Sequence, residues 1–431
     1  MKSHVITVQL AAGPPHATGA PRRRVCRRTF MAALVALSMA AAISPPSHAQ
    51  TFKVLYTFAG YPTDGDQPDA RLFMDASGNL YGTTRYGGSH EGCPGKWQCG
   101  AVFKLDTNGV ETVLYNFSGP DGANPTSNLV MDANGALYGT TEYGGYTDRC
   151  RSTGSAGCGA VFKLSSDGKE TVLHRFTGGA DGAFPLAAMV MDPAGALYGT
   201  TPYGGAAGGG VAFKLVGKKE TVLHSFCSWP NCNDGAYIGS GLIMDAAGNL
   251  YGTAAFGGDT DCGCGVVYKL AGKKETILHA FKSPPDGGEP VSTLYMDSSG
   301  NLYGTTAYGG TFNYSAGTVF EVSPDRKEHV LHKFQINGNK QRDGYHPQNA
   351  VVQDAAGDIY GSTAEGGIYD EGVVYEITTD GKEKIVHTFC GGDCSDGAHP
   401  NDLIIDSNGN LYGTTYGGGT NGNGVIFEIT P

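Results

Sequence analysis

The sequence predicts an all-β protein, a seven-bladed β-propeller whose blades are four-stranded antiparallel sheets. The phrase Leu-Tyr-Gly-Thr-Thr, or a close variant, recurs seven times at intervals of 52 to 60 residues. Glycine contributes 68 of the 431 residues, and no long amphipathic helical pattern follows residue 50. The two chain ends supply complementary parts of one repeat, as a closed ring requires. The seven copies begin at Leu80, Leu137, Leu197, Leu250, Leu302, Ile359 and Leu411.

The first 49 residues are predicted to be a signal peptide. A basic segment at residues 22–28 precedes an apolar stretch at residues 30–43, and small residues at 47–49 form a cleavage site. The pair Arg27 and Arg28 also fits a twin-arginine signal, so the Sec and twin-arginine routes are both left open. We expect one propeller domain at residues 50–431, exported to the periplasm or the extracellular medium.

The predicted mature chain is acidic. The whole chain has a formal charge of −11, but its first 49 residues contain six basic residues and no acidic one. The remainder therefore has 24 basic against 41 acidic residues, a formal charge near −17. Such a surface disfavours nucleic-acid binding, which depends on clustered Lys and Arg. No apolar segment of membrane-spanning length follows the signal, and no motif indicates a cofactor.

Each repeat contains four short apolar runs separated by turn signals. In the second copy the strands are predicted at residues 128–132, 136–141, 160–164 and 169–176. Asn-Gly and Asp-Gly pairs mark two of the turns, because these residues tolerate positive φ. In the fourth strand, period-two alternation places Val172, His174 and Phe176 on one face.

The phase of the repeat predicts how the ring closes. The mature chain begins on a fourth strand, residues 52–58, and ends on a third strand, residues 425–429. The first strand of the chain therefore completes a blade with the last three, a one-plus-three closure. An open β-solenoid is the alternative, but its terminal repeats should be atypical caps, and here they are typical copies.

These motifs resemble a known family. LYGTTxYGG, followed by GxVFKL, DGxETVLxxF and DGxxP, is similar to the GloVer-type tandem repeat of exported bacterial proteins. The resemblance covers about residue 52 to the end and implies no particular activity. The strand-turn-strand core DxxGNLY is more loosely similar to gluconolactonase-like and virginiamycin-lyase-like propellers, through structural turns only.

Seven Asp-Gly pairs open the loops between blades, and we interpret them as turn residues. Asp side chains satisfy turn amides and Gly supplies the dihedral angle, whereas calcium needs several oxygens converging on one point. One Asp per blade does not provide them, so no metal site is expected. The pairs begin at Asp64, Asp121, Asp181, Asp234, Asp286, Asp343 and Asp396.

A histidine that recurs in the fourth strand is likewise predicted to be structural. Fourth strands lie on the outer rim, each in a different blade, so these histidines cannot meet one another. The position is occupied by His174, His224, His279, His332 and His387, and by Tyr56 and Tyr115 in the other two copies.

The loops between blades and the loops between second and third strands should emerge on one face, here called the loop face. An aromatic-Gly-Gly phrase recurs there at Tyr86, Tyr143, Tyr203, Phe256, Tyr308 and Tyr416. Blade six departs from the rule, with Glu365 in place of the aromatic residue and His346 in the loop that enters the blade. Departure from a repeat makes a residue a better functional candidate.

Ten cysteines lie in loop-face segments as close pairs, which in an exported chain predicts disulfides rather than zinc ligands. A Cys262–Cys264 bridge would be strained, so the pairing among Cys227, Cys232, Cys262 and Cys264 is left open. The pairs are Cys93 and Cys99, Cys150 and Cys158, Cys227 and Cys232, Cys262 and Cys264, and Cys390 and Cys394.

Both tryptophans of the chain, Trp97 and Trp229, lie between paired cysteines. A rigid, exposed aromatic platform suits stacking on a sugar or anchoring a protein. We therefore expect a non-enzymatic binding protein that contacts a glycan or a protein through the loop face, with Tyr86, Tyr143 and Asn128 as further contacts.

Two alternatives are kept. One is a propeller enzyme, a lyase or a metal-dependent lactonase-like hydrolase, with its site at the mouth of the central channel; its weak catalytic candidates are Arg71, Asp402, His346 and Glu365, with Asn128, Thr293 and Asn349 nearby. No nucleophile elbow or HExxH motif supports it. The other is a structural assembly platform, although a monomer is expected.

Overall fold

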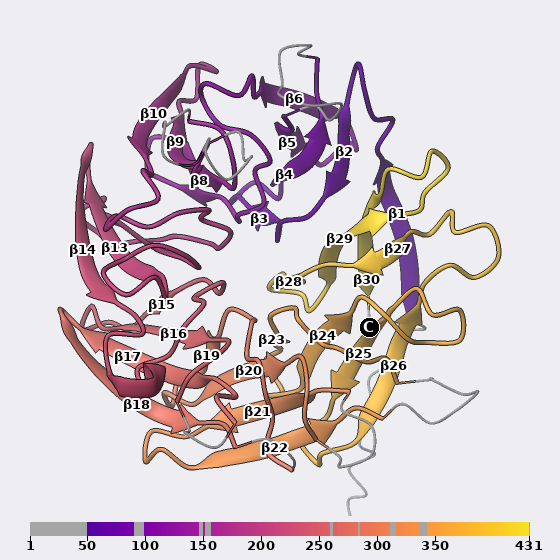
Figure 1. Ribbon diagram of the computed structural model, residues 1–431. Helices are drawn as coiled ribbons and strands as arrows, with labels where there is room; N and C mark the ends of the chain where they lie inside the picture. Colours follow the sequence, from indigo (N-terminus) through magenta and orange to yellow (C-terminus); the bar gives the residue numbers. More distant parts are fainter. Residues whose placement is uncertain are drawn as a thin grey trace, which may run out of the picture. The chain divides into compact units, whose positions relative to one another are not determined.

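The structure, a computed structural model, describes residues 50–430 apart from 90–98, 146–149, 151–156, 259–261, 283–284, 311–315 and 336–342. Seven antiparallel sheets surround a central axis (Figure 1). The predicted seven-bladed β-propeller is confirmed. The predicted signal peptide lies outside the described residues. Within the described part of the chain, no helix has the length and apolar character needed to span a bilayer.

Each blade runs from a two-residue inner strand to an outer strand of six or seven residues. Blade 1 contains β2 (Gly65–Pro68), β3 (Phe73–Met74), β4 (Leu80–Gly87), β5 (Ala101–Leu105) and β6 (Glu111–Asn116). Blade 2 contains β7 (Val130–Met131), β8 (Leu137–Thr141), β9 (Ala160–Leu164) and β10 (Glu170–Arg175). Blade 3 contains β11 (Val190–Met191), β12 (Leu197–Thr201), β13 (Val211–Val216) and β14 (Lys219–Ser225).

The next three blades repeat this order, and a 3-10 turn, η1 (Pro230–Cys232), precedes blade 4. Blade 4 contains β15 (Ile243–Met244), β16 (Leu250–Ala254), β17 (Val266–Ala271) and β18 (Lys274–Ala280). Blade 5 contains β19 (Tyr295–Met296), β20 (Leu302–Thr306), β21 (Thr318–Val322) and β22 (Glu328–Lys333). Blade 6 contains β23 (Val352–Gln353), β24 (Ile359–Thr363), β25 (Val373–Ile377) and β26 (Glu383–Thr388).

Blade 7 is shared by the two ends of the chain. It contains β27 (Ala398–Pro400), β28 (Ile404–Ile405), β29 (Leu411–Gly417), β30 (Val425–Thr430) and β1 (Thr51–Thr57). Strand β1 pairs antiparallel with β30 from Thr51 opposite Thr430 to Thr57 opposite Val425. The predicted one-plus-three closure is therefore confirmed, and no blade has to stand at an open end.

The Leu-Tyr-Gly-Thr-Thr phrase recurs because each of its residues builds the blade. In blade 2, the hydroxyl of Tyr138 donates to Asp132 Oδ2 at 2.9 Å, and the amine of Lys163 lies 5.1 Å from the Tyr138 ring centroid. A Cβ at Gly139 would lie 2.6 Å from Phe162 Cζ, so only glycine leaves room for that ring.

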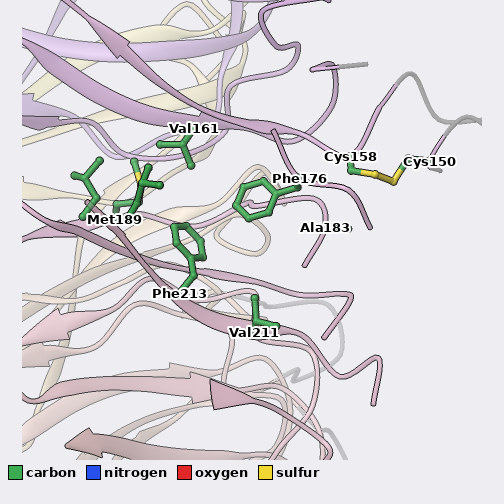
Figure 2. Packing of buried hydrophobic residues seen from close by; sticks show 10 residues of the cluster. Cys150, Cys158, Val161, Phe176, Ala183, Met189, Val211 and Phe213 are labelled. Atoms are coloured by element: carbon green, nitrogen blue, oxygen red, sulfur yellow. A yellow bond between two sulfur atoms is a disulfide. The ribbon is translucent and has the colours of Figure 1, made fainter. Parts of the chain in front are cut away.

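The rings beside these glycines hold neighbouring blades together. The aromatic residue of each third strand meets the last aromatic residue of the preceding blade, at centroid distances of 4.9 to 5.3 Å and steep interplanar angles. Figure 2 shows one such junction, where Phe176 of blade 2 and Phe213 of blade 3 are buried with Val161, Met189 and Val211. Such pairs contribute about 0.5–1.5 kcal/mol each beyond their buried area.

The fourth strands carry a bulge that the sequence pattern did not reveal. In blade 2, Val172 lies opposite Phe162, but His174 lies opposite Val161, so one residue of β10 is unpaired. Because successive positions on β9 point to opposite faces, Val172 and His174 do not share a face. The predicted alternation through Val172, His174 and Phe176 is wrong at this point.

The bulge turns the recurring histidine or tyrosine toward the next blade, where it meets the Asp of the Asp-Gly pair. Asp64 accepts hydrogen bonds from the Ala59 amide at 2.7 Å and the Tyr56 hydroxyl at 2.8 Å. Histidine takes the place of tyrosine in five junctions, with Nε2 lying 3.0 to 3.9 Å from the Asp Oδ2. The Asp-Gly pairs are therefore turn residues, as predicted, and they also anchor the outer strand.

A glutamate from the next outer strand closes six of these junctions. The glutamates lie beside the Asp, and burial, together with the Asp charge, raises the pKa of Glu111, Glu170 and Glu383 to about 7 and that of Glu275 to about 8. The pKa values of Glu220 and Glu328 are also raised, chiefly by burial. At the seventh junction Phe52 replaces the glutamate and stacks on His387, with centroids 3.9 Å apart.

The glycine of the repeat phrase can be tested on strand β29. We expect Gly413→Ala to lower the free energy of unfolding by about 1–3 kcal/mol, because its Cβ would lie 2.5 Å from Phe427 Cζ. Gly417→Ala on the same strand is the control, since its Cβ would meet nothing within 4 Å. Urea unfolding of the two variants should separate them, and equal losses would contradict the packing argument.

The junction glutamates predict a pH dependence. Since the folded pKa of Glu111 is about 7, ionising this carboxyl in the folded protein destabilises it as the pH rises from about 4.5 to 7. Glu111→Gln removes this loss, so we expect it to be about 1 kcal/mol more stable than wild type at pH 8, after discounting for partial exposure, and to show no such gain at pH 4.5. Thermal melts at both pH values test this, and a gain of equal size at both would refute it.

Candidate functional site

The loop face is built as predicted. Each loop that enters a blade pairs with the segment that follows the second strand, for example Ala123 with Tyr143 and Tyr345 with Glu365. This pairing places the Asp-Gly loops and the aromatic-Gly-Gly segments side by side around the mouth of the ring. Whatever differs between blades in these two segments is therefore presented on one surface.

One position in every entering loop has a strained backbone. The fourth residue of the Asp-Gly-x-x phrase has φ between 50° and 59° in all seven blades, a conformation that costs a residue with a Cβ about 1–2 kcal/mol. The amide of each donates to a backbone oxygen of the preceding blade at 2.7 to 3.1 Å. The residues are Gln67, Asn124, Phe184, Tyr237, Glu289, His346 and His399.

The backbone conformation at this position is therefore the same in all seven blades, whereas the side chain differs from blade to blade. Only His346 of this set was singled out from the sequence. The signal was present, because this position is variable inside a phrase whose other residues repeat. A conformation that is kept at a cost, with a side chain free to differ, is typical of a functional position.

Aromatic side chains from three adjacent blades form a continuous arc on this face. Tyr143, Phe184, Tyr203, Tyr237 and Phe256 contact one another in that order, with successive centroids 5.3 to 6.0 Å apart. Tyr203 and Phe256 are among the exposed large apolar side chains. The predicted contact residue Tyr143 therefore belongs to a larger aromatic surface.

A pocket lies at the end of this arc, between blades 4 and 5. Its volume is about 200 Å³, and its lining includes Phe256, Tyr308, Glu289 and the bonded pair Cys262 and Cys264. Phe256 and Tyr308 are 43% and 42% exposed. Burial raises the pKa of Glu289. Two exposed aromatic rings and one carboxyl group thus face the same small cavity.

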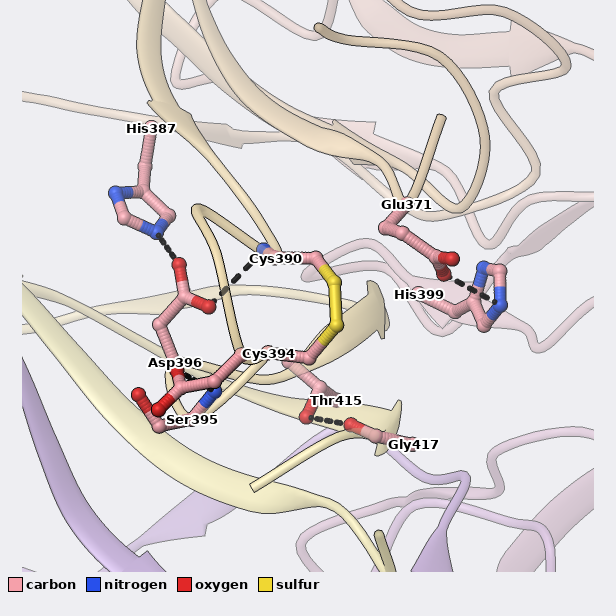
Figure 3. The surroundings of a disulfide bond; sticks show 10 residues. Glu371, His387, Cys390, Cys394, Ser395, Asp396, His399, Thr415 and Gly417 are labelled. Carbon is pink, nitrogen blue, oxygen red and sulfur yellow. Dashed lines mark hydrogen bonds and ion pairs between the residues drawn. A yellow bond between two sulfur atoms is a disulfide. The ribbon is translucent and has the colours of Figure 1, made fainter. Parts of the chain in front are cut away.

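Blade 6 places an imidazole against a carboxylate, and both belong to residues that the departure from the repeat had singled out separately. His346 Nδ1 lies 3.2 Å from Glu365 Oε2, and the His346 ring lies 5.1 Å from that of Tyr308. A second pair in the next blade was missed: His399 Nε2 lies 3.1 Å from Glu371 Oε2 (Figure 3). His399 Nδ1 also contacts the Ala364 carbonyl at 2.7 Å.

Blade 7 also lacks an aromatic residue at this position, because its Tyr-Gly-Gly phrase lies one residue earlier than in the other blades. Ala398 pairs with Gly417, where other blades have the aromatic residue. Tyr416 therefore occupies the preceding position, that of Arg85 in blade 1. Blades 6 and 7 both lack the aromatic residue of the aromatic-Gly-Gly segment. The aromatic part of the loop face therefore ends where the two His–Glu pairs begin.

Arg85 forms a charged cluster that was not predicted. Its guanidinium lies 3.0 Å from Asp69 and 2.8 Å from Glu142, and 5.9 Å from the ring of the predicted contact residue Tyr86. Burial opposes the charge of Arg85, but Glu142 and Asp69 outweigh it and hold the pKa of Arg85 above its usual value. The cluster links blades 1 and 2 beside the mouth.

The central cavity has a volume of about 160 Å³ and is lined by residues from all seven blades. Arg71 and Asp402 face it, and burial lowers the pKa of Arg71 and raises that of Asp402, while each charge opposes the other's shift. Asp402 Oδ1 accepts a hydrogen bond from the Ala350 amide at 2.7 Å. Part of the carboxylate is therefore used to join two blades.

Other residues predicted at the mouth have the same structural use. Asn128 Oδ1 accepts from the Arg71 amide at 2.8 Å, and Thr293 Oγ1 accepts from the Gly241 amide at 3.0 Å. Asn349 donates to the Pro400 carbonyl of blade 7 at 2.9 Å. The bond from Arg71 uses one of the two lone pairs of Asn128 Oδ1.

Eight of the cysteines are bonded within their own loops. The pairs Cys150–Cys158, Cys227–Cys232, Cys262–Cys264 and Cys390–Cys394 are disulfides, which settles the pairing that spacing had left open. Cys99 is disulfide-bonded, and Cys93 and Trp97 lie outside the described residues. Trp229 is 44% exposed, and its amide donates to Asp234 Oδ1 at 3.2 Å.

Metal-ligating side chains gather elsewhere. In the described part of the chain, the groups of three His, Asp or Glu donors close enough for one ion all lie at the outer junctions between blades.

Comparison with known proteins agrees with the fold. A model of the Gloeobacter/Verrucomicrobia repeat matches residues 43–150, 149–342 and 315–431. No curated protein gives a significant match. Virginiamycin B lyase from Staphylococcus aureus is similar in structure, at 11% identity and a TM-score of 0.55, over 88% of this chain and 100% of that one.

Two further structures are similar at the level of the fold. A streptogramin B lyase gives 12% identity and a TM-score of 0.55 over 88% of this chain and 97% of that one. The extracellular domain of a putative hybrid two component system from B. thetaiotaomicron gives 15% identity and a TM-score of 0.53 over 89% of this chain and 41% of that one. At such identities the likeness concerns the radial arrangement of blades and not the chemistry.

The strained ring of loop residues can be tested at Glu289. We expect Glu289→Gly to raise the free energy of unfolding by up to about 1 kcal/mol, because the left-handed backbone costs about 1–2 kcal/mol for a residue with a Cβ and glycine gives back part of this in backbone entropy. Thermal unfolding is the measurement. A clear loss of stability would show that the Glu289 side chain supports the fold.

Proposed function

The chain belongs to the Gloeobacter/Verrucomicrobia repeat family, and we propose that it is an exported binding protein that holds a glycan on its loop face. The observation that carries the proposal is the pocket between Phe256 and Tyr308. Its two exposed rings can stack on the apolar faces of sugar rings, and Glu289 can accept hydrogen bonds from sugar hydroxyl groups.

The size of the site agrees with a small, extended ligand. A cavity of about 200 Å³ is below the range of about 300–1,000 Å³ typical of pockets for drug-sized ligands. It suits one sugar unit, and the arc from Phe256 back to Tyr143 offers further stacking positions for the units that follow. Disulfide-stiffened loops bind at a lower entropic cost, because less motion is lost on binding.

Export is supported by two features of the chain. Residues 1–49 have the pattern of a signal peptide, and disulfides persist in oxidising compartments. The extracellular domain of the two component system with the same radial fold adds an example of such a ring outside the membrane. We propose a periplasmic or extracellular monomer.

The second candidate is an enzyme acting near the mouth. The pairs His346–Glu365 and His399–Glu371 favour it, because a carboxylate beside an imidazole is an arrangement suited to proton transfer. A substrate lying across blades 6 and 7 would meet both pairs. A screen for lyase and lactonase activity, with His346→Gln as the control, separates this candidate from simple binding.

The glycan site can be tested by mutation. We expect Phe256→Ala together with Tyr308→Ala to weaken binding to the best ligand of a glycan array by at least about tenfold, since loss of an aromatic contact costs about 1–3 kcal/mol in stacked complexes. Val216→Ala, an exposed apolar position in the hairpin of β13 and β14, is the control. Unchanged affinity in the double variant, measured by calorimetry, would place the ligand elsewhere.

A further inference from the structure

The junction between blades 3 and 4 brings three metal-ligating side chains to one point. His224 comes from β14, the outer strand of blade 3, and Glu275 comes from β18, the outer strand of blade 4. Asp234 lies in the Asp-Gly loop that joins the two blades. Three separate segments of the chain therefore supply one imidazole and two carboxylates.

Two of the three spacings between these atoms fit a tetrahedral metal site. His224 Nε2 lies 3.4 Å from Asp234 Oδ2 and 3.3 Å from Glu275 Oε2. Ligands about 2.0–2.2 Å from a zinc ion in tetrahedral geometry are separated by about 3.3–3.6 Å. The three donor atoms all lie within 4.8 Å of one another, close enough for one ion to hold them together.

The donors are buried, and those of His224 and Glu275 lack hydrogen-bond partners. The side chains of Glu275 and Asp234 are 2% and 0% exposed. Neither oxygen of Glu275 nor Nε2 of His224 makes a hydrogen bond with the described residues. Buried polar atoms are nearly always hydrogen-bonded, and an exception calls for a bound water or ion. Here two unsatisfied atoms, His224 Nε2 and Glu275 Oε2, lie 3.3 Å apart.

The position of Asp234 is held independently. Its Oδ2 accepts hydrogen bonds from the amide and the hydroxyl of Ser228, at 2.9 and 2.7 Å, and its Oδ1 accepts from the Trp229 amide. Such partners orient a ligating carboxylate in the way that second-layer hydrogen bonds do in metal sites. The charges also balance, because two carboxylates offset one divalent cation.

We propose that His224, Asp234 and Glu275 bind a zinc ion that joins blades 3 and 4 at the rim of the ring. One imidazole and two carboxylates form a ligand set that suits zinc, and the fourth position is open to water. This site is separate from the loop-face pocket and does not depend on glycan binding.

The repeat contains related sites and natural negatives. The donors of His279, Asp286 and Glu328, and those of His332, Asp343 and Glu383, also lie within 4.8 Å of one another. The other four junctions do not assemble the set: Tyr56 and Tyr115 stand in the histidine position, Phe52 stands in the glutamate position and stacks on His387, and His174, Asp181 and Glu220 lack the close spacing. Junctions of the same shape therefore occur with and without the full ligand set.

No metal site was expected at the Asp-Gly pairs, because one Asp per blade supplies too few oxygens. In the structure, a histidine and a glutamate reach the same Asp from the two flanking outer strands. The bulge in β14 is needed for this, since it turns His224 toward blade 4, while Val222 packs with the core of blades 2 and 3.

The test uses the oxidised protein without a histidine tag, stripped with EDTA and dialysed against zinc chloride. Bound zinc is counted by mass spectrometry after gel filtration, and the Tm is measured with and without zinc. We expect Glu275→Gln and His224→Tyr to bind one zinc ion fewer than wild type. Glu111→Gln, at a junction with tyrosine in place of histidine, should bind as many as wild type.

His224→Tyr guards against a folding defect, because it copies the natural junctions at Tyr56 and Tyr115. Zinc should raise the Tm of wild type more than that of either ligand variant. Equal zinc counts in wild type and both ligand variants would overturn the proposal. So would a wild type that binds no zinc, in which case a proton shared between Asp234 and Glu275 would be the occupant of the junction.

Discussion

The ring depends on one repeated contact, the buried edge-to-face pair between the last aromatic residue of a blade and the third-strand ring of the next blade. Phe117 with Phe162 and Phe389 with Phe427 are examples, and every junction has such a pair. The contact requires glycine in the neighbouring second strand, because a Cβ there would overlap the ring. Tyrosine, lysine and aspartate around that glycine then fix the strand that carries it, so most of the repeat phrase serves this one contact.

Other contacts between blades lie closer to the central axis, or farther from it, than these aromatic pairs. Near the axis, Asn128 and Asp402 join inner strands through backbone amides. At the rim, Asp64 and its equivalents hold the outer strands. The outer contacts use repeated residues, whereas the inner position differs between blades, as Arg71, Asn128, Gly241, Thr293 and Asp402 show. The lining of the central cavity and the loop face are therefore the parts of the molecule on which function can differ between members of a family.

The sequence was sufficient for the blade count, the closure and the disulfide-bearing loops, because each depends on short motifs whose order along the chain maps directly onto the ring. The predicted third strand at residues 160–164 agrees with β9. It was not sufficient where residues meet across blades. His224, Asp234 and Glu275 converge through a bulge that breaks period-two alternation, and His399 meets Glu371 where its amide donates to the Glu371 carbonyl of blade 6. Tyr416 was misaligned because glycine runs hide a one-residue shift. Periodicity describes a repeat in isolation, whereas these sites arise from the contact of two repeats.

Strand β1 lies at the start of the folded chain and pairs with the last strand, Thr51 with Thr430. The final contact of the ring therefore spans nearly the whole sequence, and such contacts form late because a long loop must close first. Until β30 has been synthesised, β1 and β29 each lack the strand with which they pair in blade 7. A route that exports unfolded chains would delay this closure until after translocation, whereas a route for folded proteins would require it beforehand. The order of synthesis and export thus decides in which compartment the two ends meet.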